Sequence, residues 1–368
     1  MPQKVLFAAD SYEQLIEYQF PYLSELYMKG IELHSFAFNI ERECAFFSHN
    51  FDLGQPVSGR LHENYKVVRS IIPIISNEKY DLIVLVGEKV SALVRSALLF
   101  IHPPRPYIVD IIDGYPLESD TGLVKKLALV AKQKALKCVT DDIVALNNDD
   151  YSFALRNHLF RRNIHKFPGL GVDLSAFSKA TQEERKEARY ALHIPENAFV
   201  LLYAAEFSPR SNHEMLIEAM RFLPKDVYLY LPGTGPLLEK CREYAEELGV
   251  LPQVSFPGLY PSHVHFCHAA DIAVSSALYD SLPLGLVEAL ASSLPVVASD
   301  IKGNRELVRN GVNGYLYPSD NAYKFAEKII TIYSDSELYK ELCEADNEFL
   351  KKYDISGILP DAVETLLF

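Results

Sequence analysis

Short apolar runs alternate with longer segments of helical period along most of the chain, and this alternation limits the fold more than any other feature. Strands that alternate with helices pair in parallel, because each crossover helix returns the chain to the same edge of the sheet. In the first half, the runs are KVLFAA (4–9), DLIVLV (81–86), PYIVDII (106–112), DIVALN (142–147) and IHKFP (164–168). Residues 1–170 are therefore predicted to form a doubly wound α/β domain.

The second half repeats the pattern after a glycine-opened, polar stretch at 169–197, which we interpret as a connection with one short helix. Its predicted strands are FVLLYAA (199–205), VYLYLPG (227–233), VSFPG (254–258), DIAVSS (271–276), PVVASD (295–300) and GYLYP (314–318). We expect a second Rossmann-like domain over 171–351. The tail, about 352–368, is expected to pack back onto the first domain, and a ligand cleft is expected between the two sets of carboxyl strand ends.

The composition agrees with two large cores. The 368 residues, 49% of them hydrophobic, exceed what one core organises and exclude a disordered chain. A net charge of −13 opposes binding to phosphate backbones, so no nucleic-acid partner is expected. Five widely spaced cysteines without a CxxC pair favour a reduced, cytoplasmic setting. The most apolar stretch, Leu82 to Ile101, carries three charges and is not expected to span a membrane.

The class of ligand follows from the loops that end the strands. Neither first strand-to-helix turn contains GxGxxG, and no P-loop occurs, which disfavours a dinucleotide. In DSLPLGLVEALA a helix begins at Leu284, so the backbone N–H groups of 284–286 would point into the cleft and suit a diphosphate. Asp280 and Glu288 bracket this helix start and could hold a sugar hydroxyl and a ribose. From spacing alone, a capped helix with two solvated acids is an equal alternative.

Residues 280–320 resemble the retaining GT-B glycosyltransferases of family 4, whose E-x7-E motif is followed by EALA-x-G-x-PVVA-x-D. Here the stretch reads Asp280-x7-Glu288, then EALASSLPVVASD. Three further segments are similar to landmarks of that family: LNNDDY (146–151), GLGVDLSAF (169–177) and LPGTGP (231–236). The resemblance implies two Rossmann-like domains facing each other across a cleft.

By this resemblance, Glu288 binds the nucleotide ribose and Asp280 the donor sugar, while the amides of Leu284, Gly285 and Leu286 hold the diphosphate. Asp replaces the usual first Glu of the motif, which shortens that arm by one methylene. The implied donor site also includes Gly233 and the segment Pro257–Tyr260, with Pro257 and Tyr260 flanking the nucleobase.

Two departures concern the charged groups of the family. In the loop after the first strand of the second domain, Glu206 and Ser211 stand where the family has a basic residue and a lysine. Arg210, or alternatively Arg305, is the candidate cation for the diphosphate. On the acceptor side, Asp113 stands in the loop where the family has a catalytic histidine. Asp113 is a candidate catalytic residue together with Asp280; its alternative is a turn-forming aspartate before a glycine.

No metal or other cofactor is expected. The eleven histidines lack HExxH or comparable spacing. A helix N-terminus and an arginine can neutralise a diphosphate instead, so donor use is predicted to be independent of metal.

The segment GLVKKLALVAKQKALK (122–137) is basic within an acidic chain, with five lysines and no acid. Basic amphipathic helices dock to anionic membrane surfaces. The segment therefore predicts peripheral contact with the inner face of the cell membrane. An ordinary amphipathic helix with a lysine-rich solvent side is the alternative.

The leading hypothesis is a hexosyltransferase that moves a hexose or N-acetylhexosamine from a UDP-sugar to a glycan acceptor. The resemblance implies a retaining, cytoplasmic enzyme with a lipid-linked acceptor in capsular or exopolysaccharide assembly. The departures at Glu206, Ser211 and Asp113 motivate an alternative, a catalytically silent GT-B subunit that supports a partner glycosyltransferase. A UDP-N-acetylglucosamine epimerase is a third, less favoured hypothesis, because the 280–288 motif followed by EALA is typical of the transferases.

Overall fold

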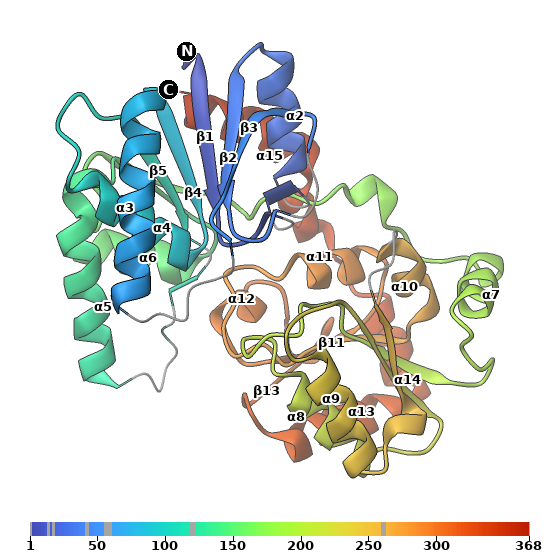
Figure 1. Ribbon diagram of the computed structural model, residues 1–368. Helices are drawn as coiled ribbons and strands as arrows, with labels where there is room; N and C mark the ends of the chain where they lie inside the picture. Colours follow the sequence, from blue (N-terminus) through green and yellow to red (C-terminus); the bar gives the residue numbers. More distant parts are fainter. Residues whose placement is uncertain are drawn as a thin grey trace. The chain divides into compact units, whose positions relative to one another are not determined.

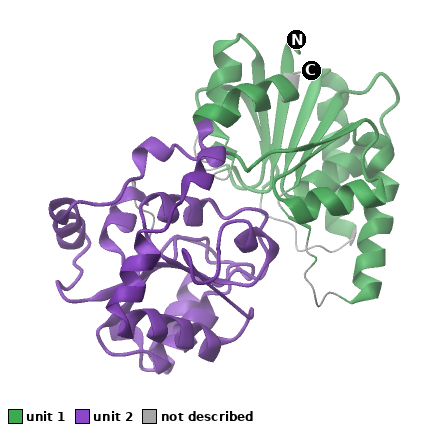
Figure 2. Cartoon of the chain, turned by 180° about the vertical axis from the view of Figure 1, so that it is seen from behind, with its two compact units in different colours: residues 1–170, 356–368 green, residues 171–355 purple. Residues whose placement is uncertain are grey.

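The chain forms two compact units. Unit 1 comprises Met1–Leu170 and Ser356–Phe368, and unit 2 comprises Gly171–Ile355 (Figure 2). The C-terminal tail thus joins unit 1 from Ser356, slightly later than the predicted position of about 352. The computed structural model describes residues 2–12, 15, 16, 19–40, 44–54, 61–112, 114, 115, 117, 122–258 and 263–367.

Unit 1 contains a parallel sheet in the order β3-β2-β1-β4-β5-β6-β7 (Figure 1). All five residues of β4 are buried, because helices cover both faces of a doubly wound sheet. Its strands are β1 Lys4–Ala9, β2 Glu32–Ala37, β3 Phe47–Asp52, β4 Leu82–Val86, β5 Tyr107–Ile112, β6 Asp142–Ala145 and β7 Asn163–Lys166. The helices are α2 Phe20–Met28, α3 Leu61–Glu78, α4 Glu88–Leu98, α5 Leu123–Leu136, α6 Asn148–Asn157 and α15 Ile355–Leu367.

Unit 2 contains a second parallel sheet, in the order β10-β9-β8-β11-β12-β13. Its strands are β8 Phe199–Leu202, β9 Val227–Pro232, β10 Val254–Gly258, β11 Ile272–Ser275, β12 Val296–Ser299 and β13 Gly314–Tyr317. The helices are α7 Gln182–Ala191, α8 His213–Ala219, α9 Leu238–Glu247, α10 His263–Ala269, α11 Leu284–Ala291, α12 Lys302–Arg305, α13 Ala322–Ser334 and α14 Ser336–Cys343. The prediction of two parallel-sheet, Rossmann-like domains is confirmed. Across the described residues, no helix combines the length and apolar character that crossing a membrane requires.

Each sheet has one point where the strand order reverses, between β1 and β4 in unit 1 and between β8 and β11 in unit 2. The loops that follow these strands diverge to opposite faces of the sheet. Ligands of open α/β sheets bind at this point, beside the carboxyl ends of the strands. In unit 2 these two loops are residues 203–212 and 276–283. They contain the predicted site residues Glu206, Arg210, Ser211 and Asp280.

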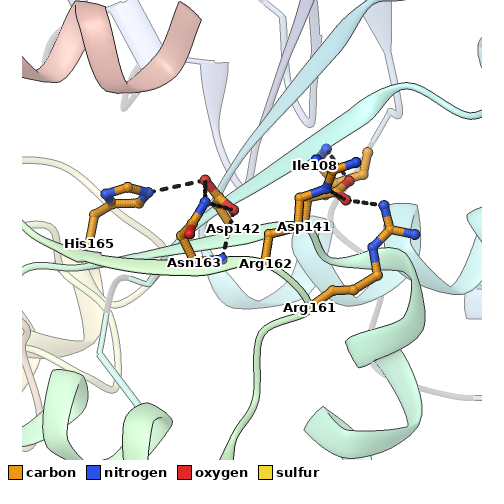
Figure 3. A network of polar contacts seen from close by, with 7 residues as sticks. All are labelled: Ile108, Asp141, Asp142, Arg161, Arg162, Asn163 and His165. Atoms are coloured by element: carbon orange, nitrogen blue, oxygen red, sulfur yellow. Dashed lines mark hydrogen bonds and ion pairs between the residues drawn. The ribbon is translucent and has the colours of Figure 1, made fainter. Parts of the chain in front are cut away.

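Two buried aspartates at the start of β6 hold the amino edge of the unit 1 sheet. Asp142 accepts hydrogen bonds from the Asn163 backbone N–H at 3.0 Å and from His165 Nε2 at 3.1 Å. Burial pushes the pKa of Asp142 up, but these hydrogen bonds outweigh it, so its pKa lies below the ordinary value. Asp141 accepts from the Ile108 backbone N–H and pairs with two arginines, which ties β5 to β6 and β7. The network in Figure 3 consists of Ile108, Asp141, Asp142, Arg161, Arg162, Asn163 and His165.

The connection into unit 2 contains the one helix that the sequence predicts there, α7. Thr181 and Glu184 form a reciprocal capping box at its first turn. Arg185 and Arg189 extend from the helix to the Asp271 carboxylate, at 2.6 Å and 2.8 Å, just before β11 begins. This pairing fastens α7 to the amino edge of the unit 2 sheet.

A buried histidine supports the loop after β8. The His213 ring, 2% exposed, stacks on the Phe207 ring with centroids 4.0 Å apart and an interplanar angle of 13°. Its Nε2 atom is buried and makes no hydrogen bond within the described chain. Burial lowers the pKa of His213 to about 3, because a charged imidazolium would lose its hydration there.

The pKa of His213 predicts a specific loss of stability in acid. The unfolded histidine takes up a proton below its ordinary pKa of about 6.5, whereas the folded one stays neutral down to about 3. The contribution of neutral His213 to the free energy of unfolding is therefore fully present above about pH 6.5. It is lost as the pH falls, by about 2 kcal/mol between pH 7 and 4.5. Urea titrations should show that the free energy of unfolding falls by about 2 kcal/mol less in His213→Phe than in the wild type between pH 7 and 4.5.

The matched control is His102→Gln at an exposed histidine, which should keep the wild-type slope. The slope is the readout, because the larger phenyl ring can itself change the absolute stability. An equal slope in wild type and His213→Phe would contradict the assignment.

Candidate functional site

The loops after β8 and β11 are bonded to each other at the carboxyl edge of the unit 2 sheet. The Leu278 backbone N–H donates to the Arg210 carbonyl at 2.9 Å. The Ser211 carbonyl accepts from the Ser276 hydroxyl at 2.7 Å and from the Tyr203 hydroxyl at 3.2 Å. The two loops that the sequence analysis singled out therefore form one polar cluster, although about 70 residues separate them.

A third loop, after β9, closes against this cluster through two glycines. Gly233 has a φ of +146°, and a Cβ there would lie 2.1 Å from the Ala205 carbonyl oxygen. A Cβ on Gly235 would lie 2.6 Å from the Phe207 carbonyl oxygen. Only glycine permits this close backbone approach, so Gly233 shapes the predicted site by letting the loop after β9 pack on the loop after β8.

The N-terminus of α11 is open toward this cluster. Its N-cap is Pro283, which provides no side-chain hydrogen bond to the first turn. Gly285 is exposed, and a Cβ there would be 3.9 Å from the nearest heavy atom, the Ala204 carbonyl oxygen. The Leu286 N–H instead donates to the Pro283 carbonyl at 3.0 Å. Of the three predicted amides, those of Leu284 and Gly285 thus remain at the open end of the helix.

The two predicted acids lie on either side of this helix start. Glu288 is largely buried, with 17% of its side chain exposed, and its Oε2 atom lies 3.2 Å from Nδ1 of His263 on α10. Asp280 is half-buried. Burial, and after it the charge of Asp280, raises the pKa of Tyr203 to about 12, while Arg210 acts in the opposite direction. The charges of Asp280 and Arg210 therefore shift the pKa of the same buried Tyr203 hydroxyl in opposite directions.

The predicted cation positions differ in their surroundings. Arg210 is half-buried within the loop cluster, whereas Arg305 is exposed and holds Asp300 through Nε–Oδ1 at 2.7 Å. Ser211 is buried, and Glu206 is exposed. Because Arg210 belongs to the loop cluster itself, it is the better placed of the two candidates for a bound anion.

Sequence reasoning missed two charged or titratable side chains at this site. Lys302 opens α12 and is only 5% exposed, next to Gly303, which packs on the Asp280 carbonyl. His263, the neighbour of Glu288, lies on α10. In the segment IKGNREL only the arginine was considered as a cation. In HVHFCHA no sequence signal indicated that His263 contacts Glu288, 25 residues later.

Two predicted residues, Asp113 and Tyr260, lie outside the described residues, and Pro257 is exposed on β10. The neighbourhood of the loop after β5 is described in part. Asn147 caps α6 by accepting from the Asp150 N–H at 2.8 Å, and Asp150 accepts from the Tyr115 N–H at 3.3 Å. Within the described ranges no group of three or more metal-binding side chains occurs.

Comparison with known proteins points to one family. Residues 184–349, most of unit 2, match the family model described as Glycosyl transferases group 1. The chain is 25% identical over 345 residues to "Putative glycosyltransferase EpsD" of Bacillus subtilis (strain 168), covering 93% of this chain and 90% of that one. It is also 25% identical over 289 residues to the UDP-Gal:alpha-D-GlcNAc-diphosphoundecaprenol alpha-1,3-galactosyltransferase of Escherichia coli, covering 76% and 73%.

A solved structure shares the fold over nearly the whole chain. HepE of Anabaena, solved in complex with UDP and glucose, is similar with a TM-score of 0.75 and 18% identity, covering 99% of both chains. At this identity the likeness establishes the fold alone, two Rossmann-like α/β domains. The family model and the relatives together support a group 1 glycosyltransferase.

The packing of Gly303 predicts how the Asp280 loop is held. A Cβ at Gly303 would lie 2.7 Å from the Asp280 carbonyl oxygen and must displace backbone, whereas one at Gly285 meets only ordinary contacts. We expect Gly303→Ala to lower the free energy of unfolding by about 1–3 kcal/mol. Gly285→Ala, the matched control, should stay within about 0.5 kcal/mol of the wild type. Chemical denaturation measures both, and equal stabilities would contradict this account of the loop.

Proposed function

We propose that the protein is a retaining glycosyltransferase that moves a hexose or N-acetylhexosamine from a UDP-sugar to a glycan acceptor. The observation that carries this proposal is the pair Asp280 and Glu288, which brackets the open N-terminus of α11 at the reversal of strand order. This pair lies inside the segment that matches the glycosyltransferase family. We further propose a lipid-linked acceptor and a cytoplasmic role in capsular or exopolysaccharide assembly.

Each group around α11 suits one part of the donor. Glu288 would accept hydrogen bonds from the ribose hydroxyls, with His263 holding its other side at 3.2 Å. The amides of Leu284 and Gly285, together with the helix dipole, would receive the diphosphate. Arg210 would add the positive charge that Ser211 cannot supply, because a guanidinium can donate two hydrogen bonds to a phosphate.

Retention of configuration requires attack on the face that the leaving group occupies. In the proposed step the bond between the sugar C1 and the β-phosphate oxygen breaks, and its electron pair stays on UDP. The acceptor oxygen then bonds to C1 from the same face, and its proton passes to the departing phosphate oxygen. Stabilisation of the negative charge that develops on UDP is the largest contribution expected from the protein. Asp280 would orient the sugar, and Asp113 would face the acceptor.

The α11 amides and Arg210 allow this neutralisation without a metal ion, so we propose metal-independent transfer. The relatives support the choice of donor and acceptor. The Escherichia coli relative is named as a transferase from UDP-Gal to a diphosphoundecaprenol-linked sugar, and the HepE structure contains UDP and glucose.

A second candidate function is a silent subunit that supports a partner glycosyltransferase. The observation that favours it is the side chain at 211, a buried serine whose carbonyl serves to join two loops. Glu206, an acid, stands at the other position where the family has a cation. This candidate predicts no transfer and no binding of a nucleotide.

The product tests the proposed function. The purified chain should transfer sugar from an α-linked UDP-sugar to a matching lipid-diphosphate acceptor, and proton NMR of the product should show the α-anomer. Addition of EDTA should leave the rate unchanged. A β-linked product would contradict retention, and loss of the rate in EDTA would contradict metal independence. Absence of transfer with every UDP-sugar and acceptor tested would favour the silent subunit.

A further inference from the structure

The two units differ at equivalent positions of their folds. The strand order reverses beside β4 in unit 1 and beside β11 in unit 2, and each of these strands is followed by a helix, α4 or α11 (Figure 1). The first backbone N–H groups of such a helix, with the helix dipole behind them, form a position for an anion. The start of α11 is open, because its N-cap Pro283 provides no side-chain hydrogen bond. The start of α4 is occupied by a side chain of the protein itself.

A carboxylate from the loop after β1 lies at the start of α4. Asp10 Oδ1 accepts a hydrogen bond from the Val90 backbone N–H at 2.6 Å, and Asp10 Oδ2 accepts from the Lys89 N–H at 3.2 Å. The Asp10 N–H also donates to the Val86 carbonyl at 3.2 Å, which ties this loop to the end of β4. Both carboxylate oxygens therefore receive amides of the first turn of α4, about 80 residues later in the chain.

The glycine before α4 allows this approach. Gly87 is the N-cap of α4 and has no side chain with which to cap it. Its φ is +99°, and a Cβ there would lie 2.7 Å from the Asp10 carboxyl carbon. Another residue at 87 would displace the aspartate. The backbone at Gly87 and the hydrogen bonds of Asp10 thus favour the same arrangement.

The buried cation beside this helix start is already paired. A small cavity of about 30 Å³ adjoins the start of α4, and its charged lining residues are Glu88, Arg95 and Asp110. Arg95 is 2% exposed, pairs with the Asp110 carboxylate at 3.1 Å and donates to Gln133 Oε1 at 3.0 Å. Its charge is therefore compensated by Asp110, and an anion in this cavity would compete with that carboxylate.

The same cavity connects the start of α4 with the loop after β5. Gly114 and Tyr115 of that loop line the cavity together with Gly87 and Ser91. In the proposed function, the loop after β5 faces the acceptor. A ligand at this loop therefore also lies beside the start of α4, where Asp10 caps the helix.

We infer that Asp10 fills the anion position of unit 1 and thereby selects an acceptor whose reacting sugar is uncharged. A carboxylate or phosphate on the ligand would meet the Asp10 charge and would find the α4 amides already bonded, and like charges brought together cost free energy. Hydroxyl groups of a neutral sugar can instead donate to carboxylate oxygens, which accept more than one hydrogen bond each. The choice of an acceptor sugar rests on the proposed function, whereas the exclusion of anions rests on unit 1 alone.

The two helix starts would then accept different charges. The open end of α11 is proposed to receive the diphosphate of the donor, and Asp10 would keep the same kind of group away from α4. A nucleotide would therefore bind to unit 2 only. An aspartate that bonds two helix amides is held in its charged form, so Asp10 acts on specificity as a positioning residue rather than as a base.

Titration with inorganic phosphate tests the exclusion of anions without any acceptor. In amide NMR spectra of the full chain, about 20 mM phosphate should leave the Lys89 and Val90 resonances of the wild type unchanged, because Asp10 already bonds both amides. In Asp10→Ala, phosphate should shift both resonances saturably. In Asp10→Asn, which keeps one oxygen acceptor but loses the charge, the shift should be intermediate. Seven buried residues hold α4 in place, so the helix should stay folded without its cap, as thermal unfolding checks.

The matched control is Asp52→Ala at the end of β3. Asp52 is exposed, and its Oδ1 atom also accepts a backbone N–H, that of Gly54 at 2.8 Å. Because this carboxylate caps a different loop, its removal should leave the Lys89 and Val90 resonances unresponsive to phosphate, as in the wild type.

A matched pair of acceptors tests the selection of an uncharged sugar. The two lipid-diphosphate glycans differ only in the reacting sugar, which is glucose in one and glucuronic acid in the other. The wild type should prefer the glucose acceptor at least about thirtyfold in kcat/KM, and Asp10→Asn should narrow this ratio at least about fivefold. A merely structural role of Asp10 would lower both rates together and leave the ratio unchanged.

Three results would overturn the inference. Phosphate could shift the Lys89 and Val90 resonances in the wild type, or folded Asp10→Ala could leave them unresponsive. Alternatively, the wild type could use the glucuronic acid acceptor as well as the glucose acceptor. Absence of transfer to either acceptor would count against the proposed function, and the phosphate titration would still decide whether Asp10 excludes anions from unit 1.

Discussion

The reversal of strand order between β8 and β11 is the constraint on which the candidate site depends. Because these neighbouring strands run in parallel, the loops that follow them begin side by side at one edge before they diverge to opposite faces of the sheet. The Ser211 carbonyl joins them by accepting from Tyr203 and Ser276, and glycines admit the third loop. The open end of α11 lies at the same edge, since the loop after β11 leads into that helix.

The same arrangement supports our proposal that the site receives a diphosphate, although it differs from the glycosyltransferases that the chain resembles. A serine at 211 contributes no charge, but its carbonyl accepts from Tyr203 and Ser276, and the neighbouring Arg210 carbonyl accepts from the Leu278 N–H. Positive potential then comes from the α11 amides and Arg210, with Lys302 buried nearby on α12. Glu288 keeps a partner in His263, so its carboxylate is positioned before a ligand binds. In our proposal these groups together take the place of the basic residue and the lysine of the glycosyltransferases that the chain resembles.

Much of the fold could be predicted because buried parallel strands leave continuous apolar runs, as β4 and β12 do. The strands β2 and β3 were missed, because ELHSFA and FSHNFD are interrupted by polar residues and carry no such run. At the site, the motif located Asp280 and Glu288, but it could not show that the Leu286 amide bonds to Pro283 or that Arg305 pairs with Asp300. Those partners, like Lys302 and His263, are set by packing between elements distant in sequence. The roles of Asp113 and Tyr260 stay predictions.

Isothermal titration of the protein with UDP, in EDTA, tests the central claim most directly, since it asks whether the open end of α11 receives a nucleoside diphosphate. We expect micromolar binding, at least about tenfold weaker in Glu288→Gln and in Arg210→Gln. Arg305→Gln, the matched arginine that pairs with Asp300, should bind like the wild type. No binding by the folded wild-type protein, or equal affinities in wild type and Glu288→Gln, would contradict the account.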